Sequence, residues 1–394
     1  MAQEAIDAGM ALLPTEPRPL GQCIGQTLRE DVYAERDNPP FDRVCMDGIA
    51  VSSAALGRGL RLYEIEATQA AGSPALRLSS PDSGIEVMTG AMLPLGTDCV
   101  IPLEEYNLAE GIVALKDGAS GEPYRNVQRR GSDSQPGVPM LKAGTRLGAP
   151  EIAVVASAGL ASVHVTRQPR LMVISTGNEL IEPGQPIQEH QVRRSNAYAV
   201  VAALHEHGFE SVGNDHIPDD VKVLGDRLSR HLNERDVLIL SGGVSKGKFD
   251  LVPQALKSLG VREIFAQVAQ RPGMPMWFGV GTTGQAVFGL PGNPVSTLIC
   301  LIRYVVPALA TAMGVPRPPQ EPIALAAGIK RGRPMTSFVP VSVQYDDLGR
   351  HLAVPRTPNG SGDFLALAGT TGFVELPPRS DGYPDGFVVD LYRW

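Results

Sequence analysis

From residue 170 to residue 313, short apolar runs alternate with segments of helical length. The strand-like runs are RLMVIS (170–175), ESVGNDHI (210–217), DVLILS (236–241) and AVFGL (286–290). Helices are expected at 195–207, 218–232, 251–259 and 295–313, with Ser195 or Asn196 as the N-cap of the first. Strands that alternate with helices form a parallel sheet that is covered on both faces. The segment therefore predicts a doubly wound α/β domain.

The rest of the chain is rich in turn residues, since 43 glycines and 34 prolines are spread over 394 residues. Residues 42–140 consist of short apolar runs separated by Gly, Pro, Asp and Asn, which predicts an all-β segment. Residues 1–16 predict a short amphipathic helix, and residues 150–164 predict a helix that ends at Gly159, followed by a strand. Beyond the proline-rich linker at 315–322, four strand-like runs predict a small β-barrel or sandwich.

Charge and cysteine content narrow the class of protein. The formal net charge is -7, and no Lys/Arg run is long enough to predict a nucleic-acid-binding surface. The four cysteines are far apart and form no CxxC pair, so neither a disulfide framework nor a zinc site is expected. The N-terminus has no signal-peptide pattern, and no apolar run predicts a bilayer span. We expect a cytoplasmic protein.

Ligands of an open α/β sheet bind where strands end and loops lead into helices. One such loop is SGGVSKGKFD (241–250), in which Gly242 and Gly243 let the backbone approach a phosphate or another oxyanion. Lys246 adds positive charge, and Asp250 is a candidate metal ligand. The alternative for this loop is a tight turn with solvated lysines.

Two further loops occupy equivalent places. In LPGNP (290–294), Asn293 and Pro294 suit the start of a helix whose free N–H groups can bind an anion. In STGNEL (175–180), Glu179 directly follows a strand. Together with Asp219 and Asp250, Glu179 is a candidate Mg²⁺ ligand. A helix cap and a solvated glutamate are the simpler alternatives. Neither GxxxxGK[ST] nor GxGxxG at a helix start is present.

A second set of motifs runs along nearly the whole chain. It begins with PPFDRVCMDGIAV (39–51), VMTGAMLPLGTDCVIPLEE (87–105) and NVQRRGSD (126–133). It continues with STGNEL, RSNAYAV, IPDD, SGGVSKGKFD, RPGMPMWFG, FGLPGNPVS and GSGDF. In this order and spacing, the motifs resemble those of the MoeA/gephyrin E-domain family of molybdopterin molybdenumtransferases.

The resemblance implies a multidomain homodimer. Its parts would be a small linking domain (17–41 and 138–165), a β-rich inserted domain (42–137), a MogA-like doubly wound α/β domain (166–314, with the helix 1–16) and a C-terminal β-barrel-like domain (320–394). The family's active-site cleft lies between the α/β domain and the β-rich insert of the partner chain. The resemblance leaves a MogA-like adenylyltransferase or molybdoenzyme maturation proteins open as partners, and it implies neither nucleic acid nor membrane.

The implied reaction inserts molybdate into adenylated molybdopterin and releases AMP with the help of Mg²⁺. By position in the motifs, the catalytic residues would be Asp47, Thr89, Asp133, Glu179, Asp219 and Asp250, of which the last three would also bind Mg²⁺. The substrates would be bound by Gly242, Gly243, Ser245, Lys246, Arg271, Pro291, Gly292, Asn293, Pro294 and Ser361.

The chain departs from the family pattern at the lysines of KxxxKPGKP, which are replaced by Gln267, Arg271 and Met274. The loss of these lysines favours one alternative, a catalytically weak paralogue that binds molybdopterin or acts as a scaffold. A second alternative is the adenylyltransferase of the same pathway, which the extra β-rich domains disfavour. We expect Met274 to weaken molybdate binding, unless Lys246, Lys248 or Arg356 supplies the missing charge.

Overall fold

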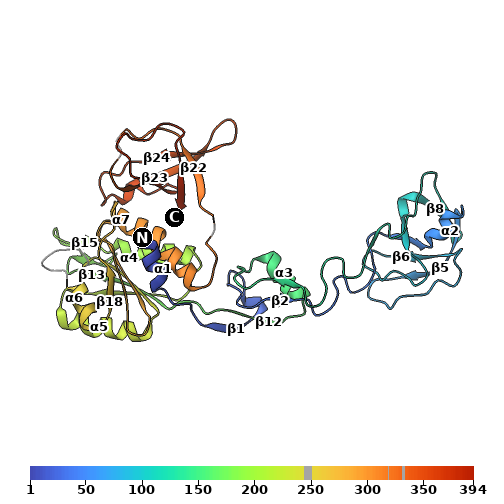
Figure 1. Cartoon of the computed structure of the whole chain (residues 1–394), viewed down its shortest axis with the longest axis horizontal. Helices are drawn as coiled ribbons and strands as arrows, with labels where there is room; N and C mark the ends of the chain where they lie inside the picture. The colour runs from blue at the N-terminus through green and yellow to red at the C-terminus, as the bar shows by residue number, and fades with distance from the viewer. Residues whose placement is uncertain (244–250, 318, 331–332) are drawn as a thin grey trace. The chain divides into compact units, whose positions relative to one another are not determined.

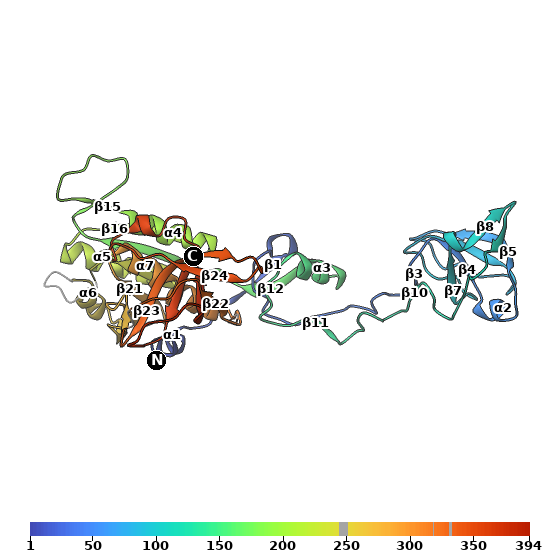
Figure 2. The same cartoon turned by 90° about the horizontal axis from the view of Figure 1, so that it is seen from above.

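The computed structural model describes residues 1–243, 251–317, 319–330 and 333–394 (Figures 1 and 2). The chain divides into two compact units. Unit 1 consists of Met1–Pro17, Gly25–Arg29 and His164–Trp394, and unit 2 consists of Arg18–Ile24 and Glu30–Val163. Strands β1 (Thr15–Pro19) and β12 (Ser162–Thr166) pair with each other, and each continues from one unit into the other.

A six-stranded sheet forms the α/β part of unit 1, in the order β16-β13-β17-β21-β20-β18. Its strands are β13 (Leu171–Thr176), β16 (Val212–Ile217), β17 (Val237–Ser241), β18 (Arg262–Phe265), β20 (Trp277–Val280) and β21 (Ala286–Leu290). The first four strands in that order are parallel, as predicted. Two further strands that the sequence analysis does not predict, β20 and β18, extend this sheet in antiparallel pairing. The short turn between β20 and β21 permits only the antiparallel pairing.

Helices cover both faces of this sheet (Figure 1). They are α1 (Ala2–Gly9), α4 (Ser195–Glu206), α5 (Val221–Glu234), α6 (Val252–Ser258) and a last helix made of α7 (Pro294–Cys300), the π-helical turn η3 (Leu301–Val305) and α8 (Val306–Ala312). Successive strand residues point to opposite faces. Leu171 and Val173 of β13 therefore pack with α1, α4 and the last helix, whereas Met172 and Ile174 pack with α5 and α6.

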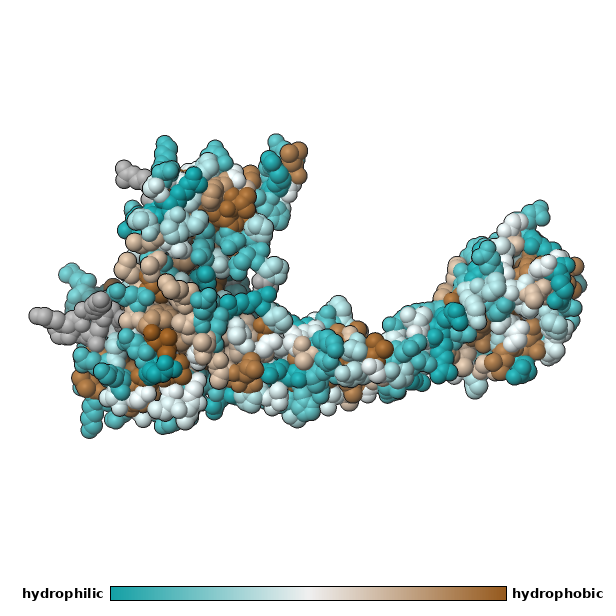
Figure 3. Space-filling model, in the orientation of Figure 1, coloured by the Kyte–Doolittle hydropathy of each residue, from teal (hydrophilic) through white to brown (hydrophobic). Residues whose placement is uncertain are grey.

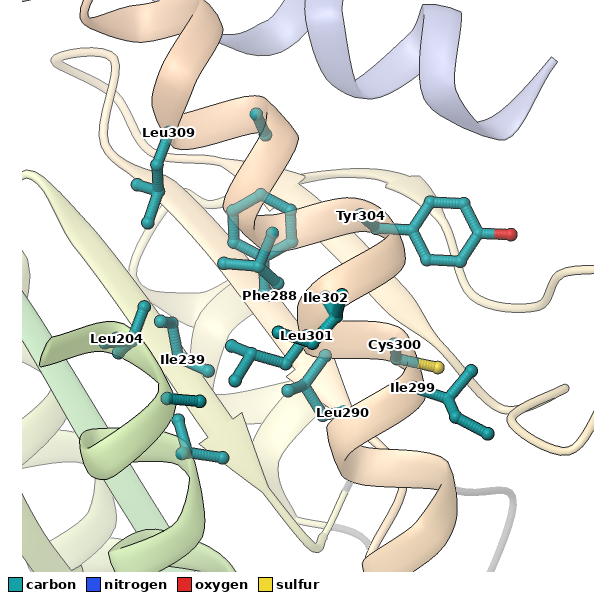
Figure 4. Close-up of a cluster of buried hydrophobic side chains, with 14 of the residues drawn as sticks. Leu204, Ile239, Phe288, Leu290, Ile299, Cys300, Leu301, Ile302, Tyr304 and Leu309 are labelled. Atoms are coloured by element: carbon teal, nitrogen blue, oxygen red, sulfur yellow. The ribbon is translucent and has the colours of Figure 1, made fainter. Parts of the chain in front are cut away.

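The first and last helices differ from the sequence-based expectation. Helix α1 ends at Gly9 rather than at residue 16, because Met10 is extended and prolines follow at 14, 17 and 19. The stretch Pro294–Ala312 is long and apolar enough to cross a membrane, contrary to our expectation, but 67% of it is buried inside the fold. It is a core helix whose side chains meet the sheet (Figure 4). On the face drawn in Figure 3, hydrophobic and hydrophilic residues are interspersed.

The C-terminal part of unit 1 is a closed β-barrel. Of the two folds that the sequence left open for this part, a barrel and a sandwich, the barrel is the one observed. Its strands are β22 (Glu321–Leu325), β23 (Thr336–Tyr345), β24 (His351–Pro355), β25 (Gly372–Leu376) and β26 (Val388–Arg393), with the short helix η4 (Phe364–Ala366). Pairing of β23 with β25 closes the ring. The two-residue strand β19 (Gln270–Arg271) adds to β23 and thereby joins the barrel to the α/β part.

Unit 2 is rich in β-structure, as predicted for residues 42–140. Its main sheet has the order β7-β4-β6-β5-β9-β8. These strands are β4 (Gly48–Val51), β5 (Leu62–Gln69), β6 (Gly84–Val87), β7 (Cys99–Pro102), β8 (Tyr106–Ala109) and β9 (Ile112–Leu115). Two smaller pairs join β2 (Val32–Tyr33) to β11 (Pro139–Leu141) and β3 (Arg43–Val44) to β10 (Val127–Gln128). The helices are η1 (Leu20–Gln22), α2 (Ser53–Gly57), η2 (Leu103–Glu105) and α3 (Ala149–Ser157).

Candidate functional site

The carboxyl ends of the parallel strands of unit 1 are aligned. Ser241 at the end of β17 pairs with Ser175 of β13 on one side and with Leu290 of β21 on the other. The loops that follow these strands therefore begin at the same edge of the sheet. This edge is where ligands bind in an open α/β fold.

A cavity of about 460 Å³, here called the edge cavity, opens at these strand ends. It is lined by residues 175–176, 179–180, 192–196, 241–242 and 292–294, and by Gly362 and Phe364 from the C-terminal part. Five of the predicted site residues lie here: Glu179, Gly242, Gly292, Asn293 and Pro294. The strands β14 (Leu180–Ile181) and β15 (Val192–Arg193) form one wall.

Four polar atoms of the edge cavity are buried without a hydrogen-bond partner in the described part of the chain. They are Ser175 Oγ, Thr176 Oγ1, Arg194 Nε and Asn196 Oδ1. A buried polar group left unpaired costs about 1–3 kcal/mol, so a cluster of such atoms indicates a ligand that would pair with them. Our site prediction omitted all four residues. Ser175 and Thr176 begin the STGNEL motif, and Arg194 and Asn196 belong to the RSN motif at the start of a helix.

Asn196 also holds the loop that leads into the last helix. Its Nδ2 donates to the Gly292 carbonyl at 2.7 Å and to Ser241 Oγ at 3.1 Å. Because the amide is used in this way, it does not cap α4, whose N-cap is Arg194 rather than the predicted Ser195 or Asn196. Asn293 is the N-cap of α7 by position, but its side chain makes no cap hydrogen bond.

The second hollow of unit 1, here called the interdomain cleft, has a volume of about 640 Å³. It is lined by residues 270–275, by Pro291, Asn293, Val295 and Ser296 at the start of the last helix, and by barrel residues between 329 and 383. Four predicted site residues lie in it: Arg271, Pro291, Asn293 and Ser361. Asn293 lines both hollows, so the edge cavity and the interdomain cleft meet at one helix start.

The charged side chains among the described residues of the interdomain cleft are positive. Arg271 and Arg333 line it, and its described lining residues include neither Asp nor Glu. Both arginines are exposed, and neither forms an ion pair with a described carboxylate. Hydroxyl donors come from Ser296, Thr357 and Ser361. Guanidinium groups beside hydroxyls suit a tetrahedral oxyanion, because both kinds of group donate hydrogen bonds to it.

Besides Arg271, the interdomain cleft has a second positively charged residue, Arg333, which the sequence analysis does not predict. Arg356, which we considered for this role, donates its Nη1 to the Ala368 carbonyl at 2.7 Å and does not line the cleft. Arg333 takes that place. No sequence motif points to Arg333, which lies between the barrel strands β22 and β23.

Two of the three candidate magnesium ligands, Glu179 and Asp219, lie in the described part of the chain. Glu179 lines the edge cavity, whereas Asp219 does not, and its carboxylate accepts a hydrogen bond from the Asn178 N–H at 3.3 Å. Asp250, with Ser245 and Lys246, lies outside the described residues. Within the described ranges, no group of three His, Cys, Asp or Glu side chains could hold a metal ion. Gly243 ends the described part of its loop and lines neither hollow.

In unit 2, two of the predicted residues form a pair. Thr89 donates both its N–H, at 2.6 Å, and its hydroxyl, at 2.7 Å, to Asp47 Oδ1. These hydrogen bonds, first the one from the backbone, lower the pKa of Asp47 below its ordinary value. Asp133 instead accepts from Gln128 Nε2 at 2.7 and 2.8 Å. All three carboxyl or hydroxyl groups are exposed or half-buried and can contact a ligand.

Three family models together cover nearly the whole chain. Residues 1–159 match the MoeA N-terminal region (domain I and II), residues 172–311 match a probable molybdopterin binding domain, and residues 322–394 match the MoeA C-terminal region (domain IV).

Two related proteins and one solved structure are similar to this chain over more than nine-tenths of its length. A molybdopterin molybdenumtransferase of Synechocystis sp. is 38% identical, with 94% of this chain and 93% of that protein covered. Molybdopterin molybdenumtransferase 2 of Mycobacterium tuberculosis is 32% identical, with 91% and 90% covered. A structure of a molybdopterin biosynthesis MoeA protein from Pyrococcus horikoshii is 26% identical, has a TM-score of 0.83 and covers 99% of this chain and 98% of its own.

Proposed function

The chain belongs to the MoeA family, and from that premise we propose that it is a molybdopterin molybdenumtransferase, which inserts molybdenum into molybdopterin. The observation that carries the proposal is the pair of hollows that meet at Asn293. One offers unpaired polar atoms for a large polar substrate, and the other offers cationic and hydroxyl donors without acids.

We assign the edge cavity to molybdopterin in its adenylated form. A molecule with a phosphate and many polar ring atoms would pair with the four buried atoms that lack partners. Arg194 supports this assignment, because its side chain is 6% exposed and keeps Nε free although Glu182 binds its Nη2 at 2.9 Å. A buried guanidinium N–H adds a charge-assisted hydrogen bond to an anion.

We assign the interdomain cleft to molybdate. Arg271 and Arg333 supply positive charge, and Ser296 and Ser361 supply neutral donors. The Val295 N–H donates to the Ser361 carbonyl at 3.0 Å, so the barrel loop that carries Ser361 is fixed to the start of the last helix. With both substrates held at adjoining sites, the reaction between them needs no further diffusive encounter.

In this proposal, the two dithiolene sulfurs of molybdopterin bond to molybdenum while one molybdate oxygen leaves as water with the thiol protons, and water cleaves the phosphoanhydride to release AMP. The residues of this chain bind and orient the two substrates, while Mg²⁺ would neutralise charge on the phosphoanhydride. Of the proposed ligands, Glu179 and Asp219 lie in the described part of the chain, and Mg²⁺ is commonly held by one or two carboxylates together with water and substrate phosphates. Asp250 remains the proposed third ligand and lies outside the described residues.

A matched pair of arginine variants tests the edge cavity. Arg194→Met should weaken the binding of adenylated molybdopterin about tenfold or more, because a charge-assisted hydrogen bond contributes roughly 1.5–3 kcal/mol. Arg230→Met makes the same change at an exposed position of α5 outside both hollows and should leave binding unaltered. Equal affinity of the two variants in equilibrium binding would exclude this location for the substrate.

A binding or scaffold protein without turnover is the second candidate function. The observation that favours it is Met274, which lines the interdomain cleft where the family pattern has a lysine. Arg333 in the same cleft favours the enzyme, because it restores a second cation. Release of AMP separates the two candidates.

We further propose that the protein acts as a homodimer in the cytoplasm. All four cysteines are free, which suits a reducing compartment. The family resemblance supports the dimer, whose active site would combine Asp47, Thr89 and Asp133 of one chain with the α/β residues of the other.

A further inference from the structure

The loop Arg271–Pro275, here called the RPGMP loop, is hydrogen-bonded to a buried polar side chain, that of Gln270, which has no role in the proposed function above. Gln270 directly precedes the loop and is 1% exposed. Its Nε2 lies 3.3 Å from the Pro272 carbonyl, 3.2 Å from the Gly273 carbonyl and 3.4 Å from Cys300 Sγ. Among the described residues, no backbone N–H donates to either carbonyl, so the Gln270 amide is the principal donor to both.

The other end of the Gln270 amide is fixed by the last helix. The hydroxyl of Tyr304, which is 5% exposed, donates to Gln270 Oε1. Tyr304 lies in the π-helical turn η3, and Cys300 immediately precedes that turn. Both side chains point away from Leu204 of α4 and Ile239 of β17 (Figure 4). A π-turn changes the direction in which helical side chains point, and such turns recur at functional sites.

The RPGMP loop packs closely against the side chains of Gln270 and Cys300. A Cβ at Gly273, whose φ is +94°, would come within 2.6 Å of Cys300 Sγ and 2.8 Å of Gln270 Nε2. Only glycine adopts this φ without strain and leaves room for both atoms. The backbone of the loop is therefore set by what lies beneath it.

We propose that Gln270 is a positioning residue, which together with Tyr304 holds the RPGMP loop so that Arg271 and Met274 face the interdomain cleft. This inference rests on the proposed function, because it assumes that the cleft binds molybdate. Gln270 lines the base of the cleft but is almost inaccessible, so it acts through the loop and not as a ligand of the anion. The same helix thus contributes Ser296 to the cleft and supports the loop opposite it through Tyr304.

Three single variants of the full chain, and a double variant that combines Gln270→Met with Tyr304→Phe, test the proposal. Gln270→Met keeps the length of the side chain and removes both hydrogen-bonding ends, and Tyr304→Phe removes a single hydroxyl. Gln285→Met is the matched control, because Gln285 Nε2 likewise donates to a backbone carbonyl, that of Leu232 in α5 at 2.7 Å, but lies outside the cleft. The readouts are molybdate binding by calorimetry and amide hydrogen exchange of the peptide 266–278 by mass spectrometry.

The expected result is a molybdate Kd about tenfold higher for Gln270→Met and about threefold higher for Tyr304→Phe, with faster exchange of the peptide in both. The double variant should bind as weakly as Gln270→Met alone, since the hydroxyl acts only through Gln270. AMP release at saturating molybdate should keep its rate, so that KM changes and kcat does not.

Wild-type affinity and exchange in both Gln270→Met and Tyr304→Phe would overturn the proposal. An equal loss of affinity in Gln285→Met would also overturn it, because the effect would then be general destabilisation. If Gln270→Met does not fold, Tyr304→Phe decides by the same criteria. Absence of molybdate binding by the wild type would contradict the proposed function, and the exchange data alone would still show whether Gln270 holds the loop.

Discussion

At Met274, the interdomain cleft has an uncharged side chain where the family pattern has a positive one. The family pattern places a lysine there, and the structure places the Met274 side chain, 42% exposed, on the interdomain cleft. A methionine packed beneath the loop would have been neutral for anion binding, but this one is half accessible to the anion. We therefore expect the missing charge to matter.

Met274→Lys should tighten molybdate binding by about 10- to 100-fold, because a charge-assisted hydrogen bond contributes roughly 1.5–3 kcal/mol. Arg333, which lines the same cleft, will move the gain toward the lower end. The measurement is the molybdate concentration that gives half-maximal AMP release. An unchanged or higher concentration in the lysine variant would exclude an anion-binding role for this position.

Asp236 provides a test of the fold that does not depend on the site. Burial alone would raise the pKa of Asp236, but hydrogen bonds from Arg170 and Arg167 outweigh it and hold the pKa at about 2. An aspartate in the unfolded chain titrates near 3.9. Since the folded pKa is the lower one, these ion pairs stabilise the fold above about pH 4, and the contribution is lost as the pH falls toward about 2.

Asp236→Asn should consequently lower Tm at neutral pH, and the difference from the wild type should shrink from about pH 4 downward. The exposed helix residue Asp226 supplies the control, because Asp226→Asn should alter Tm little at any pH. Thermal unfolding followed at several pH values gives the answer. A difference in Tm that stays constant down to about pH 3 would show that the Arg167 and Arg170 pairs contribute no pH-dependent stability.

For single residues, the sequence predicted which residues lie at the site better than it predicted which side chains contact each other. Glu179, Gly242, Gly292, Asn293 and Pro294 were expected at one sheet edge and line one cavity there. Arg333 and Gln270 were not found, because one lies between barrel strands and the other is a buried amide without a local motif. Contacts between residues far apart in the chain, such as Tyr304 with Gln270, leave no periodic signal.

Among the elements, the last helix is the one on which the proposed site depends. Its first turn is held to the preceding loop by Thr297, whose hydroxyl lies 2.6 Å from the Pro291 carbonyl and 3.0 Å from that of Asn293. Thr297 is 1% exposed. Both hollows touch this turn, so its geometry decides how the two substrates face each other.

Thr297→Val keeps the shape of the side chain and removes the hydroxyl, which should lower the free energy of unfolding by about 1–3 kcal/mol and weaken the binding of both substrates. Thr311→Val is the control in the same helix, because the Thr311 hydroxyl donates to the Pro307 carbonyl at 3.0 Å, far along the chain from the turn. Urea unfolding and equilibrium binding separate the effects. Unaltered substrate affinity in Thr297→Val would refute the role given to the turn.

Strand and helix types were predicted where the hydrophobic period was clear, as in β13, β17, β21 and the last helix. The antiparallel strands β18 and β20 were missed, because their four-residue runs are short and lie among prolines and glycines. The end of α1 was misplaced because the amphipathic pattern continues past Gly9, while the backbone becomes extended at Met10. Strands β18 and β20 are set by their pairing with neighbouring strands, and the end of α1 is set by its backbone conformation. Local composition determines neither.

For the whole molecule, the proposal of a homodimer predicts a mass in solution of about twice 41.9 kDa by light scattering. It also predicts complementation between two inactive variants, Asp47→Ala and Arg271→Ala. If each active site combines these residues from different chains, mixing the variants should restore about a quarter of the wild-type activity, since half of the dimers are mixed and each has one intact site. A monomer that releases AMP would contradict this arrangement.

The central claim is that this chain inserts molybdenum into molybdopterin and does not merely bind it. The most direct measurement is the AMP released when the purified protein is incubated with adenylated molybdopterin and Mg²⁺, with and without molybdate. We predict that AMP appears over repeated turnovers only when molybdate is present, and that the half-maximal molybdate concentration rises in Arg333→Met. Tight binding of adenylated molybdopterin without release of AMP at any molybdate concentration would contradict the claim and identify the protein as a binding paralogue.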